Sequence, residues 1–279
     1  MSHAETGRHD ADAAGDRAGA EAGAEAGERT NDRARDEAGD AASVDDRSAD
    51  DRLRDGHLRF DGVERRPGGA QTVPRPPNTT VEFGTPWSLG DTWTVAELVA
   101  PVSERSAPML PTFPDARRSA VLVLLADGPD GAEVLLTRRS MQMRNHKGEI
   151  SFPGGRCDPG ETAVETALRE AHEEVGLDPH RPRLVGELEH LSTIVSRSYI
   201  VPVVATIDER LDLRPRTMEA DRVMWTPIAD LTRPGTYHRE RWGLAPLDRP
   251  LHFFDLDDET VWGATARMLV DLLTLRRDR

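Results

Sequence analysis

The segment "PGETAVETALREAHEEVG", residues 159 to 176, contains the pattern from which the fold can be argued. Thr162 and Glu165 have the spacing of a capping box, so a helix is predicted to begin at Thr162, directly after the turn at Pro159 and Gly160. Gly176 supplies a stop, because glycine readily takes the left-handed conformation that closes a helix. The segment therefore predicts one helix between Thr162 and Gly176.

This predicted helix has an apolar face and an acidic face. Projected at 100° per residue, the apolar face, which would meet a sheet, consists of Val164, Leu168, Ala171 and Val175. Glu170, Glu173 and Glu174 lie on another arc, about 140° away in the same projection. Like charges repel at three- and four-residue spacing, and the helix dipole makes negative charge unfavourable near a C-terminus. Mg²⁺ or Mn²⁺ would remove this repulsion, since both prefer carboxylate oxygens; a solvated acidic face is the alternative.

The same residues resemble the signature of a known family. Gly155, Glu161 after five residues and "REAHEEVGL" (169–177) after seven more match the 23-residue signature of the Nudix hydrolases at every defined position. The resemblance implies an α/β fold, the Nudix α/β/α sandwich with a mixed sheet. It also implies hydrolysis of nucleoside diphosphates linked to another group, with Mg²⁺ or Mn²⁺ as cofactor. It covers the chain from about Thr94 to the C-terminus.

The resemblance assigns roles within the signature. The metal ligands that it implies are Glu170, Glu173, Glu174 and the carbonyl of Gly155. Arg169 resembles the residue that orients Glu170, and Glu161 the structural partner in the preceding loop. Metal ions would lower the pKa of an attacking water, whose proton Glu170 could accept. Glu170 and Arg169 are therefore the catalytic candidates.

The stretch upstream narrows the substrate. "LLTRRSMQMRNHKGEISFPGG", residues 135 to 155, and "VWGATARML", residues 261 to 269, resemble the coenzyme A diphosphatase branch of the family. That branch cleaves coenzyme A to 4′-phosphopantetheine and adenosine 3′,5′-bisphosphate. Because the chain carries a net charge of −14, local cations must hold a polyanionic ligand, and arginine suits phosphate. The substrate-binding residues expected are Arg139, Arg144, His146 and Gly154.

Other activities are weighed against this one. Relatives specific for ADP-ribose carry a proline where this chain has Ser192 and Thr193, and a zinc-containing NADH-type enzyme conflicts with the single cysteine, Cys157. A non-catalytic, ligand-sensing Nudix module typically lacks signature carboxylates, and all of them are present. Glu219 is a further acidic residue in a region where related enzymes often place one.

Composition sets the limits of the predicted domain. Residues 1–60 hold 16 acidic and 9 basic residues with few large aliphatic ones, so they cannot offset the entropy of ordering. Nine prolines follow within residues 67–114 and favour extended backbone. We therefore predict a disordered acidic tail and Pro-rich linker over residues 1–80, and a Nudix domain over residues 81–279.

Charge and hydropathy exclude several partners. The acidic balance argues against nucleic acid and anionic membranes, and no segment reaches the roughly 18 apolar residues of a membrane span. The N-terminus lacks the apolar core of a secretory signal, which predicts a cytoplasmic protein. The expected partner is a small nucleotide such as coenzyme A, and a homodimer is left open.

Alternating apolar runs predict the remaining elements. The predicted strands cover residues 120–125, 133–138, 184–191, 200–207, 222–225 and 251–256, and the first two would form a hairpin. One short helix is predicted to begin at Thr94, whose capping box includes Glu97, and a second, apolar helix is predicted over residues 262–275. Strands interleaved with helices indicate a layered α/β core.

Overall fold

The computed structural model describes residues 58–60, 63–65, 73–87, 93–104, 115–143, 146–193, 197–243 and 249–275. Most of the tail and linker predicted over residues 1–80 lies outside these ranges. The predicted disorder and the domain boundary after residue 80 therefore stay predictions. Before residue 73, the short strands β1 (Leu58–Phe60) and β2 (Val63–Arg65) pair antiparallel.

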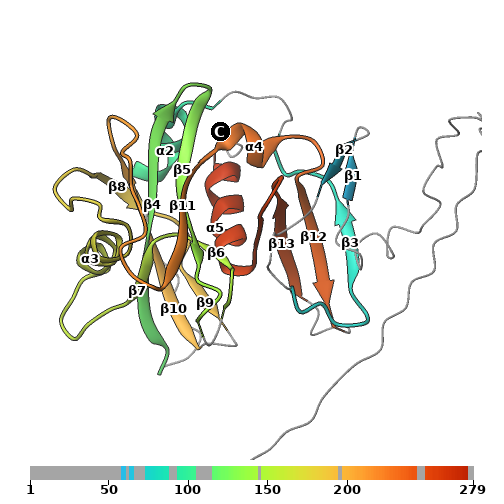
Figure 1. The fold of residues 1–279 in the computed structure, drawn as a ribbon, viewed down its shortest axis with the longest axis horizontal. Helices are drawn as coiled ribbons and strands as arrows, with labels where there is room; N and C mark the ends of the chain where they lie inside the picture. The colour runs from blue at the N-terminus through green and yellow to red at the C-terminus, as the bar shows by residue number, and fades with distance from the viewer. Residues whose placement is uncertain are drawn as a thin grey trace, which may run out of the picture. The chain divides into compact units, whose positions relative to one another are not determined.

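A mixed eight-stranded sheet forms the centre of the fold (Figure 1). Its strands are β4 (Arg117–Gly128), β5 (Gly131–Arg139), β6 (Ile150–Ser151), β7 (Gly154–Arg156), β8 (Arg183–Glu187), β9 (Leu191–Thr193), β10 (Ser198–Thr206) and β11 (Ala220–Pro227). The main path runs β11-β5-β4-β10-β8, with β6 beside β5, β7 beside β4 and β9 beside β10. β10 pairs with β4 in parallel and with β8 antiparallel, so the mixed sheet of the predicted Nudix fold is confirmed.

Helix α3 (Ala163–Val175) covers one face of this sheet. Its buried apolar residues pack with Leu122 and Leu124 of β4 and with Val201 and Val203 of β10. Ala171 and Val175 are buried, and Val164 and Leu168 are partly buried against the same core, as the projected apolar face predicts. Burial of this face, rather than helix propensity, is what fixes the helix on the sheet.

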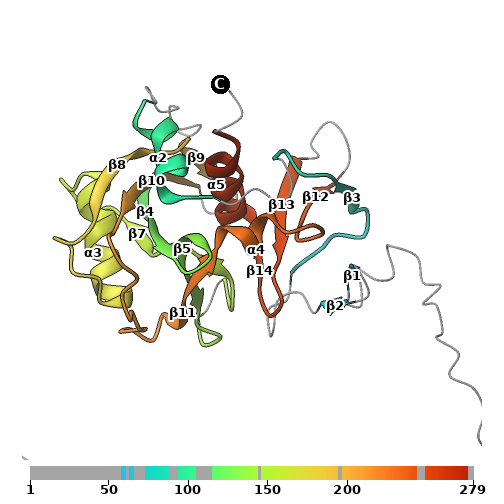
Figure 2. The ribbon, with the colours of Figure 1, turned by 90° about the horizontal axis from the view of Figure 1, so that it is seen from above.

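The other face of the central sheet meets helices and a second sheet (Figures 1 and 2). The helices are α2 (Val95–Ser103), α4 (Ile228–Thr232) and α5 (Gly263–Thr274). The second sheet has the order β14-β13-β12-β3, with β3 (Thr80–Phe83), β12 (Tyr237–Trp242), β13 (Arg249–Asp255) and β14 (Thr260–Trp262). Residues of α5, β4, β5 and β13 share one apolar core. None of the helices in the described ranges has the length and hydrophobicity to cross a membrane.

The predicted elements can be compared with the observed ones. The hairpin is confirmed, with Gly128 opposite Gly131, and so is the capping box at Thr94. The strand predicted over residues 184–191 is instead two strands, β8 and β9, and β11 is longer than its predicted core. β3, β12 and β14 were not expected.

Candidate active site

Local hydrogen bonds fix both ends of α3. The Thr162 hydroxyl accepts a hydrogen bond from Glu165 N–H at 3.2 Å, and the Glu165 carboxylate accepts one from Thr162 N–H at 2.8 Å. Gly176 has φ 78° and donates its N–H to the carbonyl of His172. The predicted start and stop are thus confirmed, and the acidic residues occupy the last turns of the helix.

Two of the three carboxylates lie against the glycines of β7. This strand pairs with β4, with Gly155 opposite Ala120. A β-carbon on Gly155 would overlap the carboxylate of Glu170, so the absence of a side chain leaves the room that Glu170 occupies. Gly154 donates its N–H to Oε2 of Glu174 at 3.4 Å. Glu173 is more exposed, with 51% of its side-chain surface accessible.

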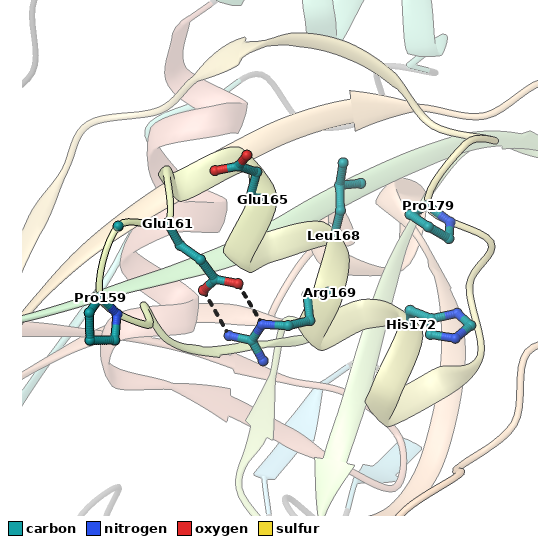
Figure 3. Close-up of a pocket in the computed structure, with 8 residues that line it drawn as sticks. Pro159, Glu161, Glu165, Leu168, Arg169, His172 and Pro179 are labelled. Atoms are coloured by element: carbon teal, nitrogen blue, oxygen red, sulfur yellow. Dashed lines mark hydrogen bonds and ion pairs between the residues drawn. The ribbon is translucent and has the colours of Figure 1, made fainter.

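Arg169 contacts both Glu161 in the loop before the helix (Figure 3) and the acidic residues of the helix itself. Its Nε and Nη2 donate to the two carboxylate oxygens of Glu161 at 2.8 and 3.0 Å, and its Nη1 donates to Glu170 at 3.0 Å and to Glu173 at 3.3 Å. The hydrogen bonds to Arg169, to Asp158 N–H and to Thr166 lower the pKa of Glu161 to about 2. The geometry therefore matches the pairing that the family resemblance implies.

Burial changes the acidity of the inner carboxylates. Glu174 is 7% exposed, and loss of solvent raises its pKa to about 7 against the opposing positive charge of Arg139. The pKa of Glu170 is also raised by burial, although Arg169 acts in the other direction. Both carboxylates thus lack the solvent that would stabilise their negative charge, and additional positive charge there would be favourable.

Arg139 brings positive charge to this face. At the end of β5, its Nη2 lies 3.7 Å from Oε2 of Glu219, and its charge acts on Glu174. The Glu219 carbonyl accepts a hydrogen bond from Ser140 N–H at 2.7 Å, so the segment before β11 lies beside the end of β5. The structure thus places Arg139, Gly154 and the acidic face of α3 together.

The other predicted substrate residues are placed differently. Arg144 lies outside the described residues. His146 is exposed, has φ 58° and contacts the Glu149 carboxylate at 2.8 Å; in the described part of the chain it forms no hydrogen bond or ion pair with the three glutamates. Arg138 points to the opposite side of β5 and forms an ion pair with Glu259. No motif or spacing in the sequence predicts the contact between Arg138 and Glu259.

A shallow hollow lies on the outward side of α3 (Figure 3). Its lining residues are Pro159, Gly160, Glu161, Glu165, Leu168, Arg169, His172 and Pro179. Its lining includes Arg169, which contacts Glu170 and Glu173, but none of Glu170, Glu173 or Glu174 themselves. Hence the hollow is not the place where the predicted chemistry would occur.

The donor set fits a hard divalent cation in its chemistry. Carboxylate oxygens are the ligands that Mg²⁺ and Mn²⁺ prefer, and two of the three are desolvated with raised pKa values. Within the described ranges no three His, Cys, Asp or Glu side chains converge as a finished metal site. Arg169 accounts for part of this, since its Nη1 donates to both Glu170 and Glu173.

Comparison with known proteins gives consistent similarities. Residues 116–247 match a family model described as NUDIX domain. "Nudix hydrolase 3" of Caenorhabditis elegans is 35% identical over 192 residues, covering 60% of this chain and 77% of that protein. "Uncharacterized Nudix hydrolase NudL" of Photorhabdus laumondii is 31% identical and covers 56% and 83%, respectively. "Peroxisomal coenzyme A diphosphatase NUDT7" of Mus musculus is 33% identical over 161 residues, covering 54% of this chain and 66% of that protein.

Proposed function

This chain belongs to the Nudix hydrolase family, and we propose that within the family it hydrolyses coenzyme A to 4′-phosphopantetheine and adenosine 3′,5′-bisphosphate. The observation that carries the proposal is that the upstream pattern and the acidic helix meet at one place. Arg139 from that pattern acts on Glu174, and Gly154 and Gly155 contact Glu174 and Glu170. The similarity to a mouse coenzyme A diphosphatase supports the same substrate.

The residues of the chain would divide the work as follows. Arg139 binds a phosphate of the substrate, because a guanidinium makes charge-assisted hydrogen bonds to phosphate oxygens. Glu170, Glu173 and Glu174 hold the cation, together with the Gly155 carbonyl, and Arg169 keeps Glu170 in place. When bound, Mg²⁺ or Mn²⁺ neutralises phosphate charge and increases the acidity of a nearby water. Glu170, whose pKa is raised by burial, accepts the proton of the attacking water.

The test is a substrate panel with product identification. Coenzyme A, ADP-ribose, NADH and dinucleoside polyphosphates are incubated with the full chain and Mg²⁺ or Mn²⁺, with the Glu174→Gln variant as a blank for contaminating activity. We expect coenzyme A to have the highest kcat/KM and to give the two products named above. Equal or faster hydrolysis of ADP-ribose would transfer the assignment to that substrate.

A further inference from the structure

A buried glutamate of the second sheet contacts the central sheet. Glu259 lies in the turn before β14, where its carbonyl accepts a hydrogen bond from Leu256 N–H at 2.8 Å. Its side chain is 1% exposed, and Oε1 accepts from Nη1 of Arg138 at 3.0 Å and from Nη1 of Arg222 at 2.9 Å. Glu259 lies beyond residues 116–247, the segment that matches the family model.

Glu259 bridges two arginines that would otherwise repel each other. Arg138 and Arg222 are direct neighbours across β5 and β11. Like charges in that arrangement destabilise a strand pair, and a buried carboxylate between them reverses the sign of the interaction. Asp258 adds a second negative charge, with its Oδ2 at 2.6 Å from Nη1 of Arg222. The two strands are thus tied together by a turn from another sheet.

This tie is made where the strand pair is irregular. The register shifts between Ala220 and Arg222, which leaves Asp221 as an extra residue in β11. Such a bulge interrupts the ladder and bends the strand, so side-chain contacts must hold the two strands there. Asp221 contributes one of them, because its Oδ2 accepts a hydrogen bond from Met141 N–H at 3.1 Å.

The bulged end of the strand pair is also the end that lines the acidic face. Arg139 directly follows Arg138 and points to the opposite face of the sheet, since side chains alternate along a strand. The direction of Arg139 is therefore set by how firmly Arg138 is held. We propose that Glu259 is a positioning residue, which holds Arg138 and Arg222 and thereby places Arg139 for phosphate binding. The role of Arg139 in this inference rests on the proposed function.

The first test does not depend on any substrate. Glu259→Gln keeps the shape and an oxygen acceptor but removes the charge between the arginines. We expect hydrogen exchange at the amides of Ser140 and Met141, which bond to residues 219 and 221, to accelerate about tenfold or more. Arg222→Gln removes the β11 side of the same link at a side chain that is 40% exposed, and it should also accelerate exchange at these two amides. It serves as the second variant if Glu259→Gln folds poorly.

A matched control separates this link from general loosening of the second sheet. Glu240 is also a buried glutamate of that sheet, at 0% side-chain exposure, but it pairs with Arg75 instead of β5 or β11. Glu240→Gln should leave exchange at Ser140 and Met141 unchanged. Unchanged exchange in both Glu259→Gln and Arg222→Gln, or equal acceleration in Glu240→Gln, would overturn the inference.

The second test is kinetic and uses whichever diphosphate the panel shows to be hydrolysed fastest. Glu259→Gln should raise KM about tenfold with kcat within about twofold, because binding geometry is disturbed and the carboxylates are not. Added to Arg139→Ala, the same change should have no further effect on KM. Additive effects would contradict positioning through Arg139. If Arg139→Ala alone leaves KM unchanged, the phosphate role in the proposed function fails, whereas the exchange result still decides whether Glu259 holds the strands.

Discussion

The carboxylate of Glu170 occupies the space in which a β-carbon on residue 155 would stand. Gly155 has no unusual backbone angle that requires glycine, so the close approach of Glu170 is the reason for a glycine there. The overlapping atoms are the end of a flexible side chain, which can move without unfolding the protein. An added methyl group would therefore displace the carboxylate rather than the strand.

We predict that Gly155→Ala lowers kcat about 100-fold while changing the free energy of unfolding by less than about 1 kcal/mol. Steady-state kinetics and urea unfolding measure the two quantities. Gly186→Ala is the control, because its β-carbon would meet Val102 of α2 at 3.2 Å, away from the acidic face. Full activity in Gly155→Ala would mean that the position of Glu170 is not critical.

The acidic cluster is tested by comparing two faces of the same helix. Glu173→Gln should abolish most activity and reduce the stabilisation that Mn²⁺ gives to the wild-type protein in a thermal melt. Without metal its stability should stay equal or rise slightly, since repulsion near the helix C-terminus is relieved. Glu165→Gln keeps a side chain that can complete the capping box, so its rate and its metal response should match the wild type. If Glu173→Gln hydrolysed substrate at the full rate, the cluster would be a solvated acidic face and not a metal site.

Arg169 offers a test of orientation without loss of charge. Lysine cannot donate to both oxygens of Glu161 and to Glu170 at once, so Arg169→Lys should lower kcat about 10- to 100-fold. Because the pKa of Glu161 is lowered, its contribution to stability is present above pH 4.5 and is lost as the pH falls towards 2. In Arg169→Lys, the free energy of unfolding should therefore decrease less than in the wild type as the pH falls from 4.5 towards 2. Unfolding curves between pH 2.5 and 6, together with kcat, measure both effects.

Two histidines of the second sheet, the buried His238 and the partly buried His252, predict opposite pH effects. Against the opposing effect of burial, hydrogen bonds to Asp255 and Glu240 raise the pKa of His238 to about 9, so its stabilisation is complete below pH 6.5 and is lost as the pH rises through 9. His238→Gln should remove this loss, which is on the order of 3 kcal/mol. Burial lowers the pKa of His252 to about 4, so its stabilisation is lost as the pH falls from 6.5 towards 4, and His252→Gln should remove this pH dependence. If the free energy of unfolding changed with pH in the same way in the wild type and in His238→Gln between pH 6.5 and 10, the raised pKa of His238 would be refuted.

Truncation separates the tail from the ordered segment that follows. Deletion of residues 1–72 should leave kcat and stability nearly unchanged, given the composition of the tail. Arg75→Ala should cost about 1–3 kcal/mol, because the buried carboxylate of Glu240 loses its hydrogen bond to Arg75 at 2.8 Å and keeps those from His238 and Trp242. Urea unfolding of the two proteins gives the comparison. A large loss of activity in the folded truncation would show that the tail completes the site.

Short sequence motifs correctly predicted the elements whose limits depend on neighbouring residues. The limits of α3 follow from Thr162, Glu165 and Gly176, and the β4–β5 hairpin from its glycine-rich turn. Strand β12 was not predicted, because its buried residues His238 and Glu240 are polar and are stabilised by ion pairs. A pattern of hydrophobic residues does not reveal such a strand.

The same distinction holds at the site. The spacing of the glutamates and of Arg169 is set within one helix, so their grouping could be read from the sequence. The contacts of Arg138 with Glu259 and of Arg139 with Glu219 depend on the register of β5 against β11 and on the bulge at Asp221. This register joins residues more than eighty positions apart in the sequence, and Glu259 lies still further along the chain.

The pairing of Arg75 with Glu240 also has a consequence for synthesis on the ribosome. The two residues are 165 positions apart, and at bacterial or eukaryotic elongation rates about ten to thirty seconds separate their emergence. During that interval β3 has no partner strand, although α3 and the β4–β5 hairpin can already form. Stalled nascent chains that end before residue 237 should thus be cleaved by protease at residues 73–83, and chains that extend past residue 275 and clear the exit tunnel should resist.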